Sequence, residues 1–89
     1  MLAERQVTIL NTLGLHVRPS AEFAGTAAKF KSRVSVVKDG QTVNGKSIMG
    51  VLMLVAAKGS WIHVKAQGED AKQALDALAT LVKDKFGED

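Results

Sequence analysis

The sequence predicts an α+β fold, an open-faced β-sandwich in which a four-stranded antiparallel sheet carries three helices on one face, in the order β-α-β-β-α-β-α. Four short segments alternate apolar and polar residues, as half-buried strands do. Three other segments place apolar residues at helical spacing, so each helix has one face to bury. With 89 residues, 46% of them hydrophobic and 24% charged, the chain is expected to form a single domain, residues 1–89.

The N-terminal third predicts a strand, a loop and a helix. Val7 and Ile9 alternate with Thr8 in a strand over residues 6–10, and residues 11–14 include the turn formers Asn and Gly. A helix that begins near Arg18 and runs to about Lys31 is indicated by apolar residues at helical spacing: Phe23, Ala24, Ala27 and Phe30. Pro19 suits the first turn of that helix, where a backbone N–H would be unpaired in any case.

The middle of the chain predicts a hairpin followed by a helix. Val34 and Val36 alternate with a serine, and Asp39-Gly40 is the strongest hairpin signal in the chain, because both residues tolerate the positive φ of a type I′ turn. Residues 41–44 form the returning strand. The mostly apolar segment 48–57 is expected to be helical and to end at Lys58-Gly59.

The C-terminal third predicts one strand and a long helix. In the strand, Ile62, Val64 and Ala66 face the helices, while Trp61, His63 and Lys65 lie on the open side; His63 is assigned no chemistry. Apolar residues line one face of the helix: Ala71, Ala74, Leu75, Leu78, Val82 and Phe86. Asp70 in its first turn, with Lys83 and Lys85 in its last, matches the helix dipole.

Composition limits the classes of protein to which the chain can belong. The chain has no cysteine and therefore none of the disulfides that small secreted domains usually need. Its net charge of +3 favours partners with acidic surfaces. No apolar run is long enough to cross a bilayer, and the N-terminus lacks the apolar stretch of a signal peptide. A cytoplasmic location without membrane insertion is therefore expected, and the chain is expected to be a monomer.

His16 is the strongest candidate for chemistry, because it stands where the first helix begins. A helix start offers free N–H groups and the positive end of the dipole, here from Val17 and Arg18. An imidazole is largely neutral near pH 7, so one ring nitrogen has a lone pair that can accept a phosphoryl group. Arg18 adds a fork of donors for phosphate oxygens. The alternative is a histidine that merely caps the helix or is half buried.

Gly14-Leu15-His16-Val17-Arg18-Pro19 resembles the active-site motif of the HPr family, small histidine-containing phosphocarriers of the bacterial phosphoenolpyruvate-dependent phosphotransferase system. A second stretch, Asn44-Gly45-Lys46-Ser47-Ile48-Met49-Gly50-Val51, is similar to the family's regulatory-serine region, and the resemblance covers essentially the whole chain. Val17 stands where alanine is usual in the family, and Ser20 where a small apolar residue is usual.

The resemblance implies a role for each residue of the first motif. His16 would accept a phosphoryl group on its δ1 nitrogen from phospho-enzyme I and pass it to a IIA domain of a sugar permease or to a regulatory paralogue. Arg18 would stabilise the phosphate. No cofactor or metal ion is needed for such a transfer. The protein would be a carrier rather than a free-standing turnover enzyme.

Residues 40–47 also satisfy the phosphate-binding pattern G-x-x-x-x-G-K-[ST]. Nucleotide binding by this segment is rejected, because Thr42 and Val43 continue the hairpin opened by Asp39-Gly40. No later strand ends in an aspartate placed to hold magnesium, and the chain is too short for the parallel sheet of such a domain.

Ser47 is expected to be the N-cap of the second helix. The resemblance implies in addition that a serine kinase could phosphorylate Ser47 and that a phosphorylase could remove the phosphate. A transcription regulator could then recognise the phosphorylated form. Phosphate at an N-cap is favourable for the helix, so any inhibition would come from the charge shown to a partner. A cap serine can equally be present without any kinase.

The second helix carries more apolar surface than one buried stripe needs. Lys46, Met49, Leu52 and Met53 are therefore predicted to form a docking patch for partners beside His16, with Lys46 and Lys29 steering acidic surfaces. The alternative is a tightly filled core.

Three other functions are compatible with part of the sequence. A nitrogen-type regulatory phosphocarrier has the same chemistry with different partners. An interaction module acting through phospho-Ser47 on a transcription regulator is compatible with the carrier role. Nucleic-acid binding is suggested by the basic charge and the open sheet face, but Trp61 is the only aromatic residue in the predicted strands on which a base could stack, so no nucleic-acid partner is expected.

Overall fold

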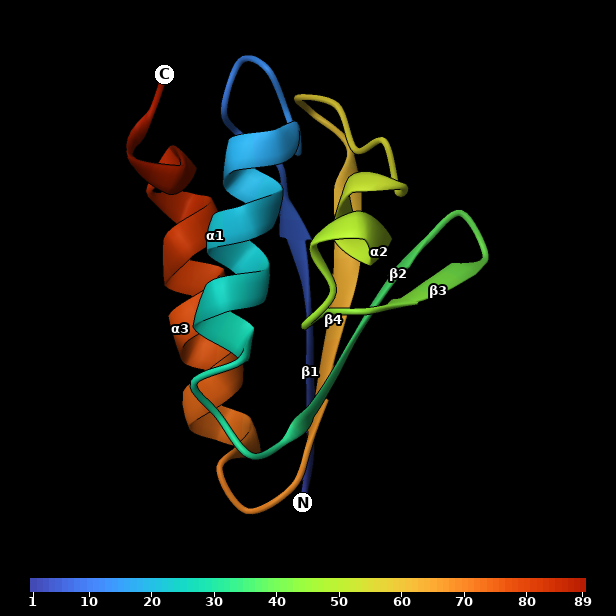
Figure 1. Cartoon of the computed structure of the whole chain (residues 1–89), viewed down its shortest axis with the longest axis vertical. Coiled ribbons are helices and arrows are strands. Elements are labelled where there is room, and N and C mark those ends of the chain that lie inside the picture. Colours follow the sequence, from blue (N-terminus) through green and yellow to red (C-terminus); the bar gives the residue numbers. More distant parts are fainter.

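The computed structural model describes residues 1–89 and contains the predicted elements in the predicted order (Figure 1). They are β1 (Leu2–Thr8), α1 (Val17–Ala27), β2 (Arg33–Lys38), β3 (Gln41–Asn44), α2 (Ile48–Leu52), β4 (Trp61–Gln67), α3 (Ala71–Lys83) and a single 3₁₀ turn, η1 (Lys85–Gly87). No helix in the chain has both the length and the apolar character needed to cross a bilayer.

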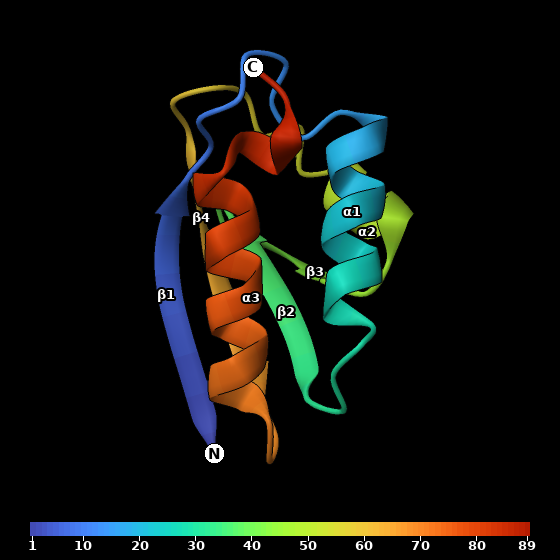
Figure 2. The same cartoon turned by 90° about the vertical axis from the view of Figure 1, so that its left-hand side faces the viewer.

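The four strands form one antiparallel sheet in the order β1-β4-β2-β3, so the last strand in the sequence lies between the first two. Figure 2 shows α1 and α3 side by side in front of this sheet, with α2 beside α1. The inward residues of β4, Ile62, Val64 and Ala66, are buried in the core with Phe23 and Leu78. The predicted α+β fold, with its helices on one side of an antiparallel sheet, is confirmed.

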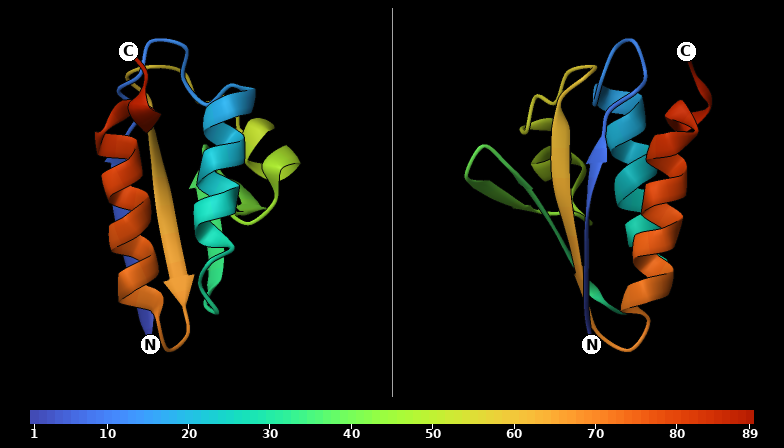
Figure 3. Two further views of the ribbon diagram at one scale, coloured as in Figure 1. Left: turned by 60° about the vertical axis from the view of Figure 1, so that its left-hand side comes forward. Right: turned by 180° about the vertical axis from the view of Figure 1, so that it is seen from behind.

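The other face of the sheet carries the polar residues of each strand. Trp61 is exposed there, and His63 Nε2 lies 2.6 Å from Glu4 Oε1 on the neighbouring strand β1. In the right-hand view of Figure 3, α1 and α3 both lie to the same side of strands β1 and β4. The alternation predicted for β4 is therefore confirmed.

The β2–β3 hairpin turns at Asp39 and Gly40, whose φ angles of 50° and 80° are both positive, as a type I′ turn requires. The segment that matched the P-loop pattern is β3 from Gln41 to Asn44, followed by a turn into α2. It is used as a strand, as the hairpin argument predicted.

Four predicted boundaries were wrong, and at the first two a tertiary contact overrides the local pattern. The first strand spans residues 2–8 rather than 6–10, because its polar start pairs with β4 along the whole length. Helix α1 ends at Ala27 rather than near Lys31, because Asp70 Oδ2 accepts the Lys31 N–H at 2.8 Å and draws the chain toward α3. Asp70 itself occupies the N-cap position of α3 without capping it.

The other two errors concern helix ends. Helix α2 stops at Leu52 instead of continuing to residue 57, and Val55 has a φ of 50°, which no α-helix accommodates. Helix α3 stops at Lys83, because Lys85 and Phe86 have positive φ values of 58° and 55°. Phe86 is nevertheless buried, so its predicted core position is correct although it lies outside the helix.

Candidate functional site

His16 is the N-cap residue of α1, with an extended backbone (φ −75°, ψ −169°). Its carbonyl accepts the Ser20 N–H at 3.0 Å, but its side chain makes no capping hydrogen bond. The N–H groups of Val17 and Arg18 are among the unpaired donors of the first turn. The partly exposed imidazole therefore stands beside free donors at the positive end of a helix dipole.

The loop that carries His16 is held on both sides of the histidine. Gly14 has a φ of 67° and packs directly on the backbone of Ala56, where no Cβ would fit. Leu15 N donates to Ala56 O at 2.8 Å. The buried Ser20 Oγ donates to Leu15 O at 3.1 Å, which gives a physical reason for a serine at this position.

A glutamate far away in the sequence reaches the imidazole. His16 Nε2 lies 2.9 Å from Glu88 Oε1, and the same oxygen accepts a hydrogen bond from Asn11 Nδ2 at 2.9 Å. The hydrogen bond from His16, followed by that from Asn11, holds the pKa of Glu88 below its usual range. An ionised carboxylate only accepts hydrogen bonds, so Nε2 is the donor of this contact, and in the neutral ring the lone pair then lies on Nδ1.

Asn11 holds the Glu88 carboxylate beside the imidazole. It is fully buried, and its Nδ2 also donates to Gly14 O at 2.7 Å. Both of its partners are pure acceptors, which determines the orientation of the amide and leaves Asn11 Oδ1 without a partner. Sequence reasoning missed Asn11 and Glu88: the first reads as a turn former, and the second follows the last predicted helix with no pattern to mark it.

Arg18 lies on the exposed surface of α1, and its Nε is 3.2 Å from Glu22 Oε1, one helical turn further on. Its terminal guanidinium nitrogens make no hydrogen bond within the protein. Arg18 therefore has donors available for an anion placed at the start of α1.

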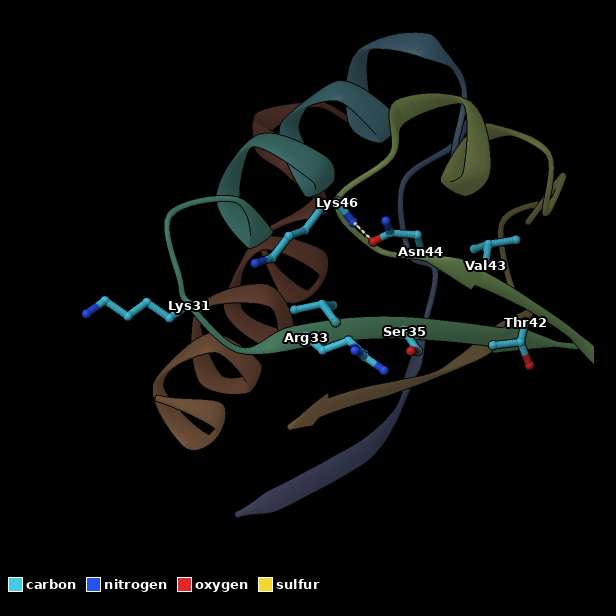
Figure 4. Close-up of a pocket in the computed structure, with 8 residues that line it drawn as sticks. Lys31, Arg33, Ser35, Thr42, Val43, Asn44 and Lys46 are labelled. Carbon is cyan, nitrogen blue, oxygen red and sulfur yellow. Dashed lines mark hydrogen bonds between the residues drawn. The ribbon is translucent and has the colours of Figure 1, made fainter. Parts of the chain in front are cut away.

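Ser47 is the N-cap of α2, as predicted: its Oγ accepts the Gly50 N–H at 3.0 Å. Lys46 folds away from this helix and donates its Nζ to Phe30 O at 2.8 Å. Lys46 lines a separate hollow of about 500 Å³, together with Lys31 and Arg33. In Figure 4 the Lys31 side chain points away from the other side chains drawn. This hollow has no converging set of cations.

An apolar hollow of about 420 Å³ adjoins His16 and is lined by Leu13, Leu15, Leu52, Val55, Ala56 and Ala57. Large apolar side chains stand exposed on α2 and at the start of α1; Met49 and Met53 are 63% and 60% exposed, and Val17 is 62% exposed. We call the exposed residues Leu13, Val17, Ile48, Met49, Met53 and Val55 the apolar collar. Of the predicted docking residues, Leu52 lies at the hollow, Met49 and Met53 belong to the collar, and Lys46 belongs to neither.

No group of three or more His, Cys, Asp or Glu side chains is arranged to hold a metal ion. The groups that the structure brings together at the site are the His16 imidazole, the Glu88 carboxylate, the Arg18 guanidinium and the free N–H groups at the start of α1.

Comparisons with known proteins assign the chain to a family. Residues 3–84 match the family model described as PTS HPr component phosphorylation site. The chain is 47% identical over 87 residues to the phosphocarrier protein HPr of Neisseria meningitidis, with 98% of each chain covered. It is 41% identical over 85 residues to the phosphocarrier protein NPr of Shewanella violacea, covering 96% of this chain and 93% of that one.

Comparison of the fold with solved structures identifies the same family. A crystal structure of HPr from Thermoanaerobacter tengcongensis superposes with a TM-score of 0.94 at 44% identity, over 98% of both chains. Together with the matched family model and the nearly full-length relatives, this likeness shows that the chain belongs to the HPr family of phosphocarrier proteins of the phosphotransferase system.

Proposed function

We propose that this phosphocarrier accepts a phosphoryl group from phospho-enzyme I on Nδ1 of His16 and passes it to IIA domains of sugar permeases. One observation carries the proposal: His16 stands at the start of α1 with Nε2 occupied by Glu88, while its Nδ1 makes no hydrogen bond within the protein. The nitrogen with the lone pair is thus the one left available for phosphorus.

The first turn of α1 supplies the electrostatic stabilisation. A phosphoryl group in transfer spreads its charge over three outer oxygens, so fixed donors around it are the main contribution a carrier can make. The free N–H groups of Val17 and Arg18 serve this purpose, and the Arg18 guanidinium adds a permanent positive charge. Neither group has to break a strong contact first, because Arg18 holds only an exposed ion pair with Glu22.

The apolar collar and the adjoining hollow are the surface on which we place the partners. The exposed methionines Met49, on α2, and Met53, directly after it, can adapt to different apolar surfaces, which suits a carrier that must bind a donor and several acceptors in turn. Leu52 lines the same hollow as His16, so a partner seated there would lie beside the histidine.

The test is intact-mass measurement after incubation with enzyme I and phosphoenolpyruvate. The parent should gain one acid-labile phosphoryl group, and His16→Ala should gain none. His63→Ala is the matched control and should gain the phosphoryl group as the parent does: His63 Nε2 also lies within hydrogen-bond distance of a carboxylate, that of Glu4, but on the open face of the sheet. A parent that gains no mass with a competent enzyme I would overturn the proposal.

Regulation through Ser47 is a second proposed function, favoured by the partly exposed position of this cap serine next to Ile48 and Met49 of the collar. A serine kinase would place a doubly charged group at the edge of the partner surface without unfolding α2. A transcription regulator that recognises phospho-Ser47 should bind the His16→Ala variant as well as the parent, which separates the two functions.

A phosphocarrier for sugar transport and a nitrogen-type regulatory phosphocarrier would use the same chemistry at His16 and differ only in their partner proteins. Transfer rates from the enzyme I of each system, measured side by side, would assign the branch.

A further inference from the structure

We propose that Glu88 is a positioning residue of the phosphorylation site, which holds the proton of His16 on Nε2 and stabilises the positive ring formed when Nδ1 is phosphorylated. The inference rests on the proposed function of His16. It adds the segment after α3, residues 84–89, to the site; we call this the tail.

The tail is built to reach His16. Lys85, Phe86 and Gly87 have φ angles of 58°, 55° and 71°, and such a run of left-handed residues reverses the chain directly after α3. Phe86 is only 2% exposed and anchors the turn in the core. Beyond it, Thr12 N donates to Asp89 O at 2.6 Å, which ties the tail to the loop that leads to His16. Two non-glycine residues accept backbone strain for this path.

The Glu88 carboxylate is specifically held in place. Its side chain is only 17% exposed, which is unfavourable for a charged group unless donors compensate. Asn11 Nδ2 and His16 Nε2 supply them, both at 2.9 Å and both to Oε1. Asn11 is itself buried, and its Oδ1 has no hydrogen-bond partner. Its amide is thus oriented so that Nδ2 donates to Glu88 and Gly14, at the cost of leaving Oδ1 unpaired.

The position of the carboxylate suits transfer rather than inhibition. Glu88 binds the Nε2 edge of the ring and leaves Nδ1 and the first-turn N–H groups without a protein partner. In the transfer, the Nδ1 lone pair forms the new bond to phosphorus, the bond between phosphorus and the donor's imidazole nitrogen breaks, and that nitrogen keeps the electron pair. The Nε2 proton stays hydrogen-bonded to Glu88 throughout, so the ring becomes cationic next to a carboxylate.

Two measurements test the role of Glu88 in the full chain. The first is the ¹⁵N chemical shifts of the imidazole nitrogens at a mildly alkaline pH, which report which nitrogen holds the proton. The parent should show His16 with its proton on Nε2, and Glu88→Ala should move it toward a mixture of tautomers. The second is the single-turnover rate of phosphorylation by phospho-enzyme I. Glu88→Ala should lower this rate by about tenfold to a hundredfold, as the loss of a carboxylate that orients a metal-ligating histidine does.

Glu88→Gln keeps the shape and an acceptor oxygen but loses the charge, so it should fall between the parent and Glu88→Ala in rate. Asp84→Asn is the matched control, since it removes an exposed carboxylate of the same tail whose side chain makes no hydrogen bond or ion pair. Unfolding midpoints of all variants verify that the fold is kept, and the His63 signals should not move.

An unchanged tautomer with an unchanged rate in Glu88→Ala would overturn the inference. A faster rate would overturn it too, because it would make Glu88 an obstacle to the incoming phosphoryl group. A parent that accepts no phosphoryl group would instead overturn the proposed function, and the nitrogen shifts would still show whether Glu88 sets the tautomer, so the two failures are distinguishable.

Discussion

Asp70 Oδ1 accepts hydrogen bonds from both the backbone N–H of Ser32, at 2.9 Å, and the Ser32 hydroxyl, at 2.5 Å. This pair joins the residue before α3 to the connection between α1 and β2, and so fixes where the two longest helices lie against each other. The carboxylate that the sequence assigned to a helix dipole in fact closes a loop.

Asp70 should make the protein sensitive to acid. The hydrogen bonds from Ser32 and from the Lys31 N–H lower its pKa from 3.8 to about 2. Because the pKa is depressed in the folded state, the ionised carboxylate stabilises the fold above the unfolded value, and this contribution is lost as the pH falls from about 4 to about 2. Urea midpoints across that range should decline more steeply for the parent than for Asp70→Asn. Parallel curves would contradict this prediction.

Gly14→Ala should destabilise the protein and impair phosphorylation together. An alanine at a φ of 67° is strained, by about 1–3 kcal/mol. Its methyl group would also collide with the Ala56 backbone, to which Leu15 is bonded, so the loop carrying His16 must shift. Chemical denaturation and the phosphorylation rate measure the two effects. Gly59→Ala is the control, because Gly59 also has a positive φ but has open space around its Cβ position.

Arg18→Gln should slow phosphorylation by about tenfold to a hundredfold, since hydrogen bonds to charged groups contribute about 1.5–3 kcal/mol. Its stability should hardly change, because the ion pair with Glu22 is exposed. Arg5→Gln removes an equal charge whose partner is Asp76 on α3, and should leave the rate unaltered. An equal loss in both variants would indicate general steering by net charge instead of a contact at the phosphoryl group.

Replacing Ser47 separates its two roles. Ser47→Ala loses the cap bond to Gly50 N and should cost about 1 kcal/mol of unfolding free energy, measured in urea. Ser47→Asp keeps a capping oxygen and should be about as stable as the parent, yet transfer the phosphoryl group several-fold more slowly, with an effect that diminishes at high salt. A salt-independent loss in Ser47→Asp would point to a distorted α2.

The double variant Met49→Ser, Met53→Ser should raise the KM for enzyme I by about fivefold or more, which corresponds to about 1 kcal/mol of docking energy. Stability should be nearly unchanged, because both side chains are largely exposed. Leu2→Ser provides the control, an exposed apolar residue of β1 at the distant end of the sheet. A KM unaffected by the double variant would remove the apolar collar from the partner surface.

The sequence by itself determined which elements form and in what order. Alternation in β4, helical spacing in α1 and α3, and the Asp39-Gly40 turn are local properties, and local backbone geometry is enough to express them. The N-cap positions of His16 and Ser47 are local properties too, because a helix terminus is marked by the residues next to it.

Only the tertiary structure decided the strand order, the ends of the helices and the second half of the site. The insertion of β4 between β1 and β2, the capture of the Lys31 N–H by Asp70 and the bond between His16 and Glu88 each join residues that are distant along the chain. Periodicity describes which face of an element is apolar, but not which other segment that face meets. Glu88 reaches His16 because strained residues after α3 turn the chain back and Phe86 holds that turn in the core, and no local pattern encodes such a path.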